Sequence, residues 1–180
     1  MHDAPSASSP LRGLTKGIDH VTLPVLDLGI AEQFYVGVLG AELIERFDAA
    51  QFLKYRPERR AELDDPTNSP LHISLQLGGT TRLDLFLQPY GQPAITQPHP
   101  HIAFEIAAAE LDAAARHLTA SGIPVDGPRR LGPPGQASLY FLDPFGNKLE
   151  LVTTTYHREI PVGAPSWTQL AYSFHPGRTS

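Results

Sequence analysis

Hydrophobic and polar residues follow the same order in the two halves of the chain. In the first half, residues 18–25 (IDHVTLPV) alternate as a β-strand does. Residues 28–40 (LGIAEQFYVGVLG) carry apolar residues at helical spacing, with Asp27 as a potential N-cap and Gly40 as a stop. The segments AELIERF, LHISLQL and RLDLFLQ alternate again. The first half is therefore predicted to be β-α-β-β-β.

The second half repeats this pattern from residue 101 onward. HIAFEI is predicted to be a strand, and AAELDAAARHLTASG is predicted to be a helix that ends at Gly122. IPVDGPRRL reads as a strand running into a loop, and SLYFLDPFGNKLELVTT as a hairpin turned at DPFG. Two β-α-β-β-β modules in one chain predict an α+β fold.

The repeat divides the chain into four parts. Residues 1–16 are small, polar and proline-containing, and are expected to form a flexible tail. The first module is expected over 17–97, the second over 98–155, and a C-terminal extension over 156–180. The first module is longer, and the polar run RPERRAELDDPTNSP predicts an inserted loop at about 56–70, which we expect near the mouth of a cavity.

Composition excludes several classes of function. The net charge of −5 predicts no nucleic-acid partner, and the absence of cysteine excludes disulfides and thiolate metal sites. The sequence contains neither a signal-peptide pattern nor a stretch long enough to cross a membrane, so a cytoplasmic location is expected. Neither nucleic acid nor a membrane is therefore expected as a partner.

The repeat also returns the same chemistry to matching positions. His20 in the first strand is matched by His101, and Asp84 in RLDL is matched by Glu150 in KLEL. An acidic side chain between strand leucines is costly to bury unless it is paired or bound to a cation. Imidazole and carboxylate groups are ligands of divalent metals. We therefore predict that the four side chains converge on one metal ion.

Four residues are candidates for roles beside the metal. Asp84 is expected either to be a fourth ligand or to act as a base. Tyr140 lies one strand back from Glu150 across the DPFG turn, so its phenol is expected beside that carboxylate and is a catalytic candidate. Thr22, on the same strand face as His20, and His72, in LHISL, are candidates for binding substrate.

The segments IDHVTLPVLDL, FYVGVLGAEL, HIAFEI and LYFLDPFGNKLEL resemble the vicinal oxygen chelate superfamily over about residues 17–155. The resemblance implies paired βαβββ modules that form a partly open mixed β-barrel with helices outside. It implies one divalent ion (Fe²⁺, Mn²⁺, Zn²⁺ or Ni²⁺) held by His20, His101 and Glu150. It also implies an enzyme whose small-molecule substrate chelates this ion through adjacent oxygens, and a homodimer.

Several activities occur among the proteins that the chain resembles. Glyoxalase-like lyases and isomerases use a fourth ligand at the position of Asp84. Extradiol dioxygenases share the run from Leu139 to Glu150, but their acid-base histidine has no counterpart in RRLGPPGQAS. Fosfomycin-inactivating transferases share the ligand set, but the place of one of their cationic residues is taken by Glu159. A metal-free binding protein of the bleomycin-resistance type is a further alternative.

Overall fold

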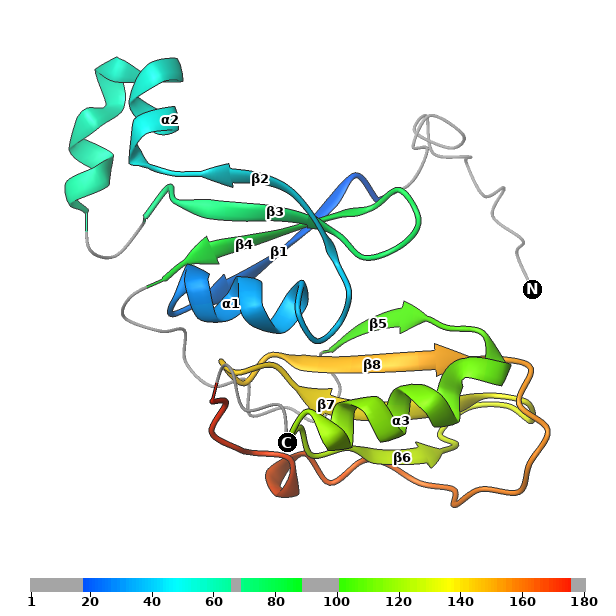
Figure 1. Ribbon diagram of the computed structural model, residues 1–180. Helices are drawn as coiled ribbons and strands as arrows, with labels where there is room; N and C mark the ends of the chain where they lie inside the picture. Colours follow the sequence, from blue (N-terminus) through cyan, green and yellow to red (C-terminus); the bar gives the residue numbers. More distant parts are fainter. Residues whose placement is uncertain (1–17, 66–68, 89–100, 176–180) are drawn as a thin grey trace, which may run out of the picture.

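The structure of this chain is a computed structural model that describes residues 18–65, 69–88 and 101–175. The expected tail at 1–16 and the expected boundary between residues 97 and 98 lie outside the described residues. Within them the chain forms two four-stranded mixed sheets, each with its own helix (Figure 1). No helix in this part of the chain is long and apolar enough to cross a membrane.

The first module contains β1 (His20–Val25), α1 (Leu28–Tyr35), β2 (Glu42–Phe47), β3 (His72–Gln76) and β4 (Arg82–Leu87). Its sheet has the order β1-β4-β3-β2. Strands β1 and β4 are parallel, and the other pairs are antiparallel. A parallel pair needs a crossover connection, and α1 begins that connection.

The second module repeats this topology with β5 (Ile102–Glu105), α3 (Leu111–Ala120), β6 (Asp126–Arg129), β7 (Ala137–Leu142) and β8 (Lys148–Thr153). A short 3₁₀ turn, η2 (Ala108–Glu110), precedes α3. The order β5-β8-β7-β6 matches that of the first sheet strand for strand. The predicted α+β fold of two βαβββ modules is confirmed, and the described sheets do not close on each other, as expected for a partly open arrangement.

Local interactions start α1 at the predicted position, but the helix ends at Tyr35 and not at Gly40 as the sequence pattern predicted, because residues 36–39 form turns. The Asp27 carboxylate accepts a hydrogen bond from the Ile30 amide at 2.8 Å, which satisfies one of the free amides at the helix start. The apolar side of the helix buries Ala31, Phe34 and Tyr35. The chain then turns through Gly40, whose φ of 73° lies in the left-handed region that glycine tolerates best.

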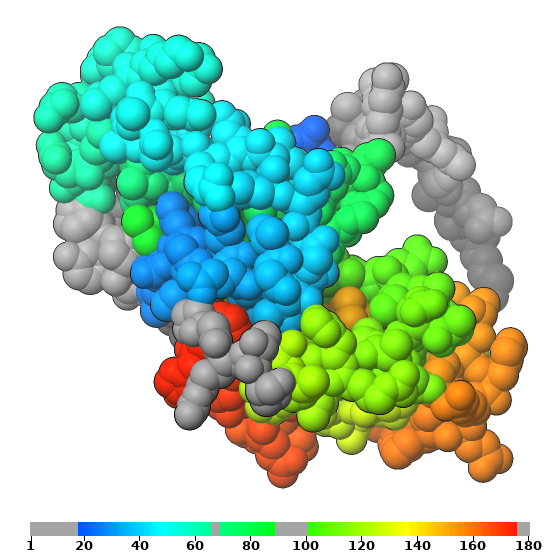
Figure 2. Space-filling view, viewed as in Figure 1, coloured from blue at the N-terminus to red at the C-terminus, as the bar shows by residue number. Residues whose placement is uncertain are grey.

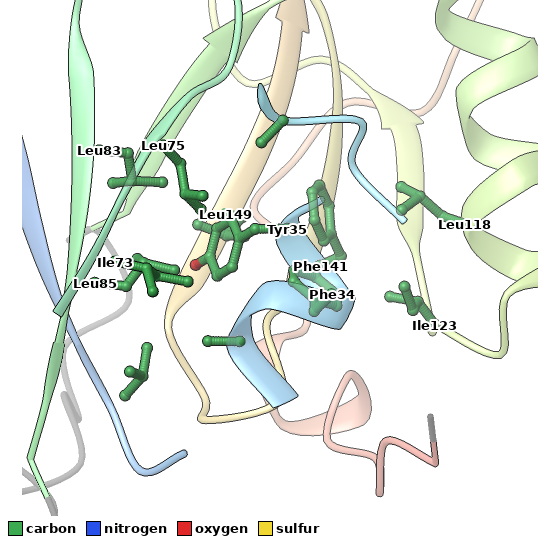
Figure 3. Close-up of a cluster of buried hydrophobic side chains, with 13 residues drawn as sticks. Phe34, Tyr35, Ile73, Leu75, Leu83, Leu85, Leu118, Ile123, Phe141 and Leu149 are labelled. Carbon is green, nitrogen blue, oxygen red and sulfur yellow. The ribbon is translucent and has the colours of Figure 1, made fainter. Parts of the chain in front are cut away.

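The main hydrophobic core lies between the two sheets, with α1 in its centre. Phe34 and Tyr35 of α1 pack against leucines and isoleucines of the first sheet and against Phe141 and Leu149 of the second (Figure 3). Both sheets therefore contribute their leucine faces to one core. Because side chains alternate along a strand, the residues between those leucines point away from the core on both sheets.

A buried turn ties the second module to the first. Asp143, in the DPFG turn, is only 2% exposed. Its carboxylate accepts hydrogen bonds from the Tyr35 hydroxyl at 2.9 Å and from the Asn147 side chain at 2.7 Å. Asn147 also donates to the Pro24 carbonyl at 3.0 Å. Burial raises the pKa of Asp143 above its usual value.

The insertion in the first module is more ordered than a loop. It contains α2 (Ala49–Tyr55) and the 3₁₀ helix η1 (Pro57–Asp64), so most of the segment expected to be a loop at 56–70 is helical. Arg59 and Glu62 form a two-pronged ion pair at 2.5 and 2.6 Å. This contact between residues three apart favours a helical turn. Figure 2 shows the insertion, in cyan, projecting from one end of the first module.

The C-terminal strap, residues 156–175, runs back across the second module. Val162 forms an isolated bridge with Arg130, and the Ser166 amide donates to Asp126 at 2.8 Å. After the 3₁₀ turn η3 (Trp167–Gln169), the Tyr172 hydroxyl donates to the Leu142 carbonyl at 3.1 Å. The strap is therefore attached to the sheet on both sides of η3.

Candidate metal and substrate site

The strand register confirms that the two halves match residue by residue at the predicted site. In the parallel pair β1 and β4, Thr22 lies opposite Asp84, and His20 precedes Thr22 by two residues. In the parallel pair β5 and β8, Ala103 lies opposite Glu150, and His101 precedes Ala103 by two residues. Each sheet thus carries one histidine and one acid at equivalent places on the face away from the core.

The second module brings its two predicted ligands into contact. His101 Nε2 lies 2.7 Å from Glu150 Oε2. Glu150 is only 4% exposed, and its other oxygen, Oε1, is buried with no hydrogen-bond partner among the described residues. A buried carboxylate oxygen without a partner is energetically costly. This pair is therefore the part of the site that fits a cation best.

Tyr140 lies beside this pair, as the hairpin pattern predicted. It is paired with Glu150 in the register of β7 and β8, and its ring lies 6.0 Å from that of His101 in an edge arrangement. Burial raises the pKa of the Tyr140 phenol against a lowering by Ser138, and the charge of Glu150 also raises this pKa. The phenol is thus a proton donor next to the His101 and Glu150 pair.

In the first module, the acidic residue Asp84 has hydrogen-bond partners on both of its oxygens. Asp84 is 3% exposed and accepts hydrogen bonds from the Ser74 hydroxyl at 2.6 Å and from Arg82 Nε at 2.9 and 3.1 Å. The same hydrogen bond raises the pKa of Arg82. The Arg82 guanidinium compensates for the burial of the Asp84 charge. Sequence analysis had expected a metal ion to provide this compensation. Arg82 was missed there, although its place two residues before Asp84 on one strand face could have revealed it.

His20 and Thr22 lie on the same face of the sheet, toward solvent. The His20 side chain is 44% exposed, and its Nδ1 lies 2.8 Å from the Asp19 carboxylate. This hydrogen bond lowers the pKa of Asp19. Thr22 is exposed directly opposite Asp84. Both side chains are therefore accessible to a ligand or to another protein surface.

His72 is held between two aromatic rings. It stacks on Phe47 with ring centres 4.9 Å apart and on Phe86 with ring centres 4.4 Å apart. Its Nδ1 lies 3.0 Å from the Pro70 carbonyl oxygen. These contacts explain its position by packing, and its predicted role in substrate binding stays a prediction.

The four predicted ligands do not converge within one chain. Among residues 18–65, 69–88 and 101–175, no three His, Cys, Asp or Glu side chains are grouped so that they could hold a metal ion. The reason is the shared core: the leucine faces of both sheets pack together, so the faces with Asp84 and Glu150 point away from each other. The sequence repeat predicted equivalent positions correctly, but it could not predict which faces of the two sheets are turned toward each other.

One contact residue of this site was not anticipated. Trp167, in the strap, has its ring centre 5.5 Å from that of Tyr140 and 6.2 Å from that of His101. Lys148 Nζ lies 5.4 Å from the centre of the indole. Sequence analysis assigned no site role to Trp167, because its distance along the chain from His101 and Tyr140 hides what it covers.

Sequence comparison identifies relatives of this arrangement. The family model of the Glyoxalase/Bleomycin resistance protein/Dioxygenase superfamily matches residues 17–151. A 2-epi-5-epi-valiolone epimerase from Actinomyces sp is 33% identical over 168 residues, which cover 82% of this chain and 81% of that protein.

Solved structures agree with this assignment. The fosfomycin resistance protein FosX from Mesorhizobium loti has a TM-score of 0.56 and 25% identity, with 78% of this chain and 94% of that chain covered. A glyoxalase family protein from Enterococcus faecalis has a TM-score of 0.57 and 23% identity, with 78% and 99% covered, and shares the fold. Together with the matched register of the two modules, these similarities establish that the chain belongs to the Glyoxalase/Bleomycin resistance protein/Dioxygenase superfamily.

Proposed function

We propose that this protein is a divalent-metal-dependent epimerase. Its substrate would be a small polyhydroxylated ketone that binds the metal through neighbouring oxygens, and the reaction would invert a carbon next to the carbonyl. The observation that carries the proposal is the buried Glu150 carboxylate, with one oxygen on His101 and the other without a partner. The similarity to an epimerase that acts on 2-epi-5-epi-valiolone favours isomerase chemistry over ring cleavage.

The residues present fit a divalent cation. His20, His101 and Glu150 offer two imidazoles and one carboxylate, a set that suits Mn²⁺, Fe²⁺, Zn²⁺ or Ni²⁺. Such an ion would act as a Lewis acid on the substrate carbonyl and so acidify the adjacent C–H bond. A cation would also satisfy the unpartnered oxygen of Glu150.

Inversion requires that a proton leaves one face of the carbon and returns to the other. Asp84, supported by Arg82 and Ser74, is our candidate for the group that removes the proton. Tyr140, whose phenol pKa is raised by burial, is our candidate for the group that returns it. The two groups come from different sheets, which suits attack on opposite faces. Thr22, opposite Asp84, is placed to hydrogen-bond a substrate hydroxyl.

We further propose that two chains complete each site. The acidic faces of the two sheets point away from each other within a chain. A second chain with its first sheet against the second sheet of its partner would join His20 and Asp84 of one chain to the His101 and Glu150 pair of the other. A two-fold arrangement of this kind produces two identical sites.

Metal analysis and proton exchange test the proposed activity. Wild-type protein purified without chelator should contain a stoichiometric divalent ion and should exchange the proton next to the carbonyl of 2-epi-5-epi-valiolone with D₂O. Glu150→Gln should weaken metal binding by about 100-fold or more. Glu110→Gln, an exposed acid at the start of α3, is the matched control and should change neither property. Wild-type protein that binds no divalent ion would refute the proposal.

Two further variants separate the acid-base groups from the ligands. Asp84→Asn and Tyr140→Phe should retain the metal but lower the exchange rate by about 100-fold or more, because positioned proton transfer contributes on that scale. Loss of metal in Asp84→Asn would instead make Asp84 a fourth ligand.

A metal-free binding protein of the bleomycin-resistance type is the second candidate. The lack of a three-residue metal cluster within the described part of one chain favours it. In that case wild-type protein would bind small molecules without a metal, and Glu150→Gln would bind them equally well.

A further inference from the structure

The strap holds one side chain against the candidate site. Upstream of η3, Ser166 is tied to Asp126. Downstream, Leu170 is 3% exposed, and Phe174 packs edge-on against Phe34 in the main core with ring centres 5.7 Å apart. The turn between these attachments carries Trp167. The strap is thus attached on both sides of Trp167, so burial of the indole is not needed to hold the strap in place.

The indole lies on the acidic face of the second sheet. It contacts His101, Tyr140 and Lys148, which all belong to the side of the sheet that carries Glu150. The anchoring residue Leu170 is buried, whereas Trp167 stays partly exposed. A large aromatic surface that is left partly open beside a histidine and a carboxylate is available to a bound molecule.

The two modules differ at the residue that precedes each acid by two positions. Arg82 binds Asp84 in the first module. Lys148, at the equivalent place in the second module, lies over the indole. The cation at the position equivalent to Arg82 therefore lies against the indole of Trp167. Glu150 keeps its contact with His101 and an oxygen without a partner.

We propose that Trp167 forms one wall of the substrate pocket and selects cyclic polyhydroxylated ketones over open-chain ones. This inference rests on the proposed function and narrows its substrate class. A ring carrying hydroxyl groups around its edge presents C–H bonds on its faces, and these faces pack against a flat indole. The rim oxygens remain directed toward the site of His101 and Glu150. An open-chain hydroxyketone offers the oxygens without the apolar face.

Kinetics on a cyclic and an open-chain probe test this selection. The probes are 2-epi-5-epi-valiolone and dihydroxyacetone, both followed by proton exchange in D₂O. Trp167→Ala should raise KM for the cyclic probe by about tenfold with a smaller change in kcat. The same variant should leave KM and kcat for dihydroxyacetone unchanged. Trp167→Phe should show an intermediate effect. Gln169→Ala, an exposed position in the same turn, is the matched control and should resemble wild type.

Fluorescence provides a readout that does not depend on turnover. Trp167 is the sole tryptophan of the chain, so intrinsic emission reports its surroundings. Mn²⁺ should quench this emission saturably, and the quenching should be lost in His101→Ala. The cyclic probe should then shift the emission, and dihydroxyacetone should not. The emission measurements on wild-type protein do not need a Trp167 variant, so they remain decisive if Trp167→Ala fails to fold.

The outcomes separate this inference from the proposed function. One outcome would overturn the role of Trp167 alone. In it, wild-type protein binds Mn²⁺ and exchanges the proton of the cyclic probe, but that probe does not change its emission and Trp167→Phe has an unchanged KM. An equal loss of activity on both probes in the Trp167 variants would also overturn it. Protein that binds no metal and exchanges no proton would overturn both.

Discussion

The proposal that two chains complete each site makes a quantitative prediction for mixed dimers. The perturbation is a pair of variants, His20→Ala in the first sheet and Glu150→Gln in the second. Each variant alone should lack metal and activity, because every site in its homodimer misses one ligand. In a mixed dimer, one site combines both defects. The other site combines the intact His20 of one chain with the intact Glu150 of the other.

The expected magnitude follows from this geometry. A mixed dimer should have about half of the activity of a wild-type dimer, and a random mixture, in which about half of the dimers are mixed, should have about one quarter. Metal content should follow the same ratio. The structure requires this outcome if the sites lie between chains, because the faces with Asp84 and Glu150 point apart within each chain.

The assay is co-expression with two different affinity tags, followed by sequential purification of the mixed dimer. Proton exchange and elemental analysis are then measured on the isolated species. A chain carrying both substitutions, paired with a wild-type chain, is the control. It should be inactive if sites lie between chains and half active if they lie within chains. An inactive mixed dimer of the two single variants, together with a half-active control, would refute the reasoning.

Three further predictions concern stability. Tyr35→Phe removes the hydroxyl that donates to the buried Asp143 and should cost about 1–3 kcal/mol in urea unfolding, whereas a cost near zero would show that the two modules are not coupled there. The raised pKa of Asp143 means that its protonated form stabilises the native state fully below the unfolded value of 3.8, and that this contribution is lost as pH rises through the native pKa. The difference in unfolding free energy between wild type and Asp143→Asn should therefore change over this pH range, and a pH-independent difference would contradict the assignment. Asp27→Ala removes the cap of α1 and should cost about 1 kcal/mol, measured as a lower Tm, while an unchanged Tm would contradict a role for the cap.

Much of each module could be predicted from the sequence because the signals are local. Strand alternation located β4 and β8, and the position of Asp27 located the start of α1. The pairing of Tyr140 with Glu150 followed from the length of the DPFG turn. These features depend on residues that are close in the chain, where spacing alone fixes which side chains meet.

The parts that could not be predicted depend on distant contacts. Nothing in the alternation around Leu83 or Leu149 says that both leucine faces enter one core, so the direction of the acidic faces was not determined. Trp167 reaches His101 only because the strap returns across the sheet. Arg82 could have been recognised, since an arginine two residues from a strand aspartate shares its face.

The difference between Arg82 and Lys148 has a consequence for how a doubled module acquires specialised parts. Here the Arg82 guanidinium binds the Asp84 carboxylate, whereas the Lys148 ammonium lies over the Trp167 indole. Two sheets with the same strand order can thus hold matching carboxylates in different surroundings, because the side chains next to each carboxylate differ.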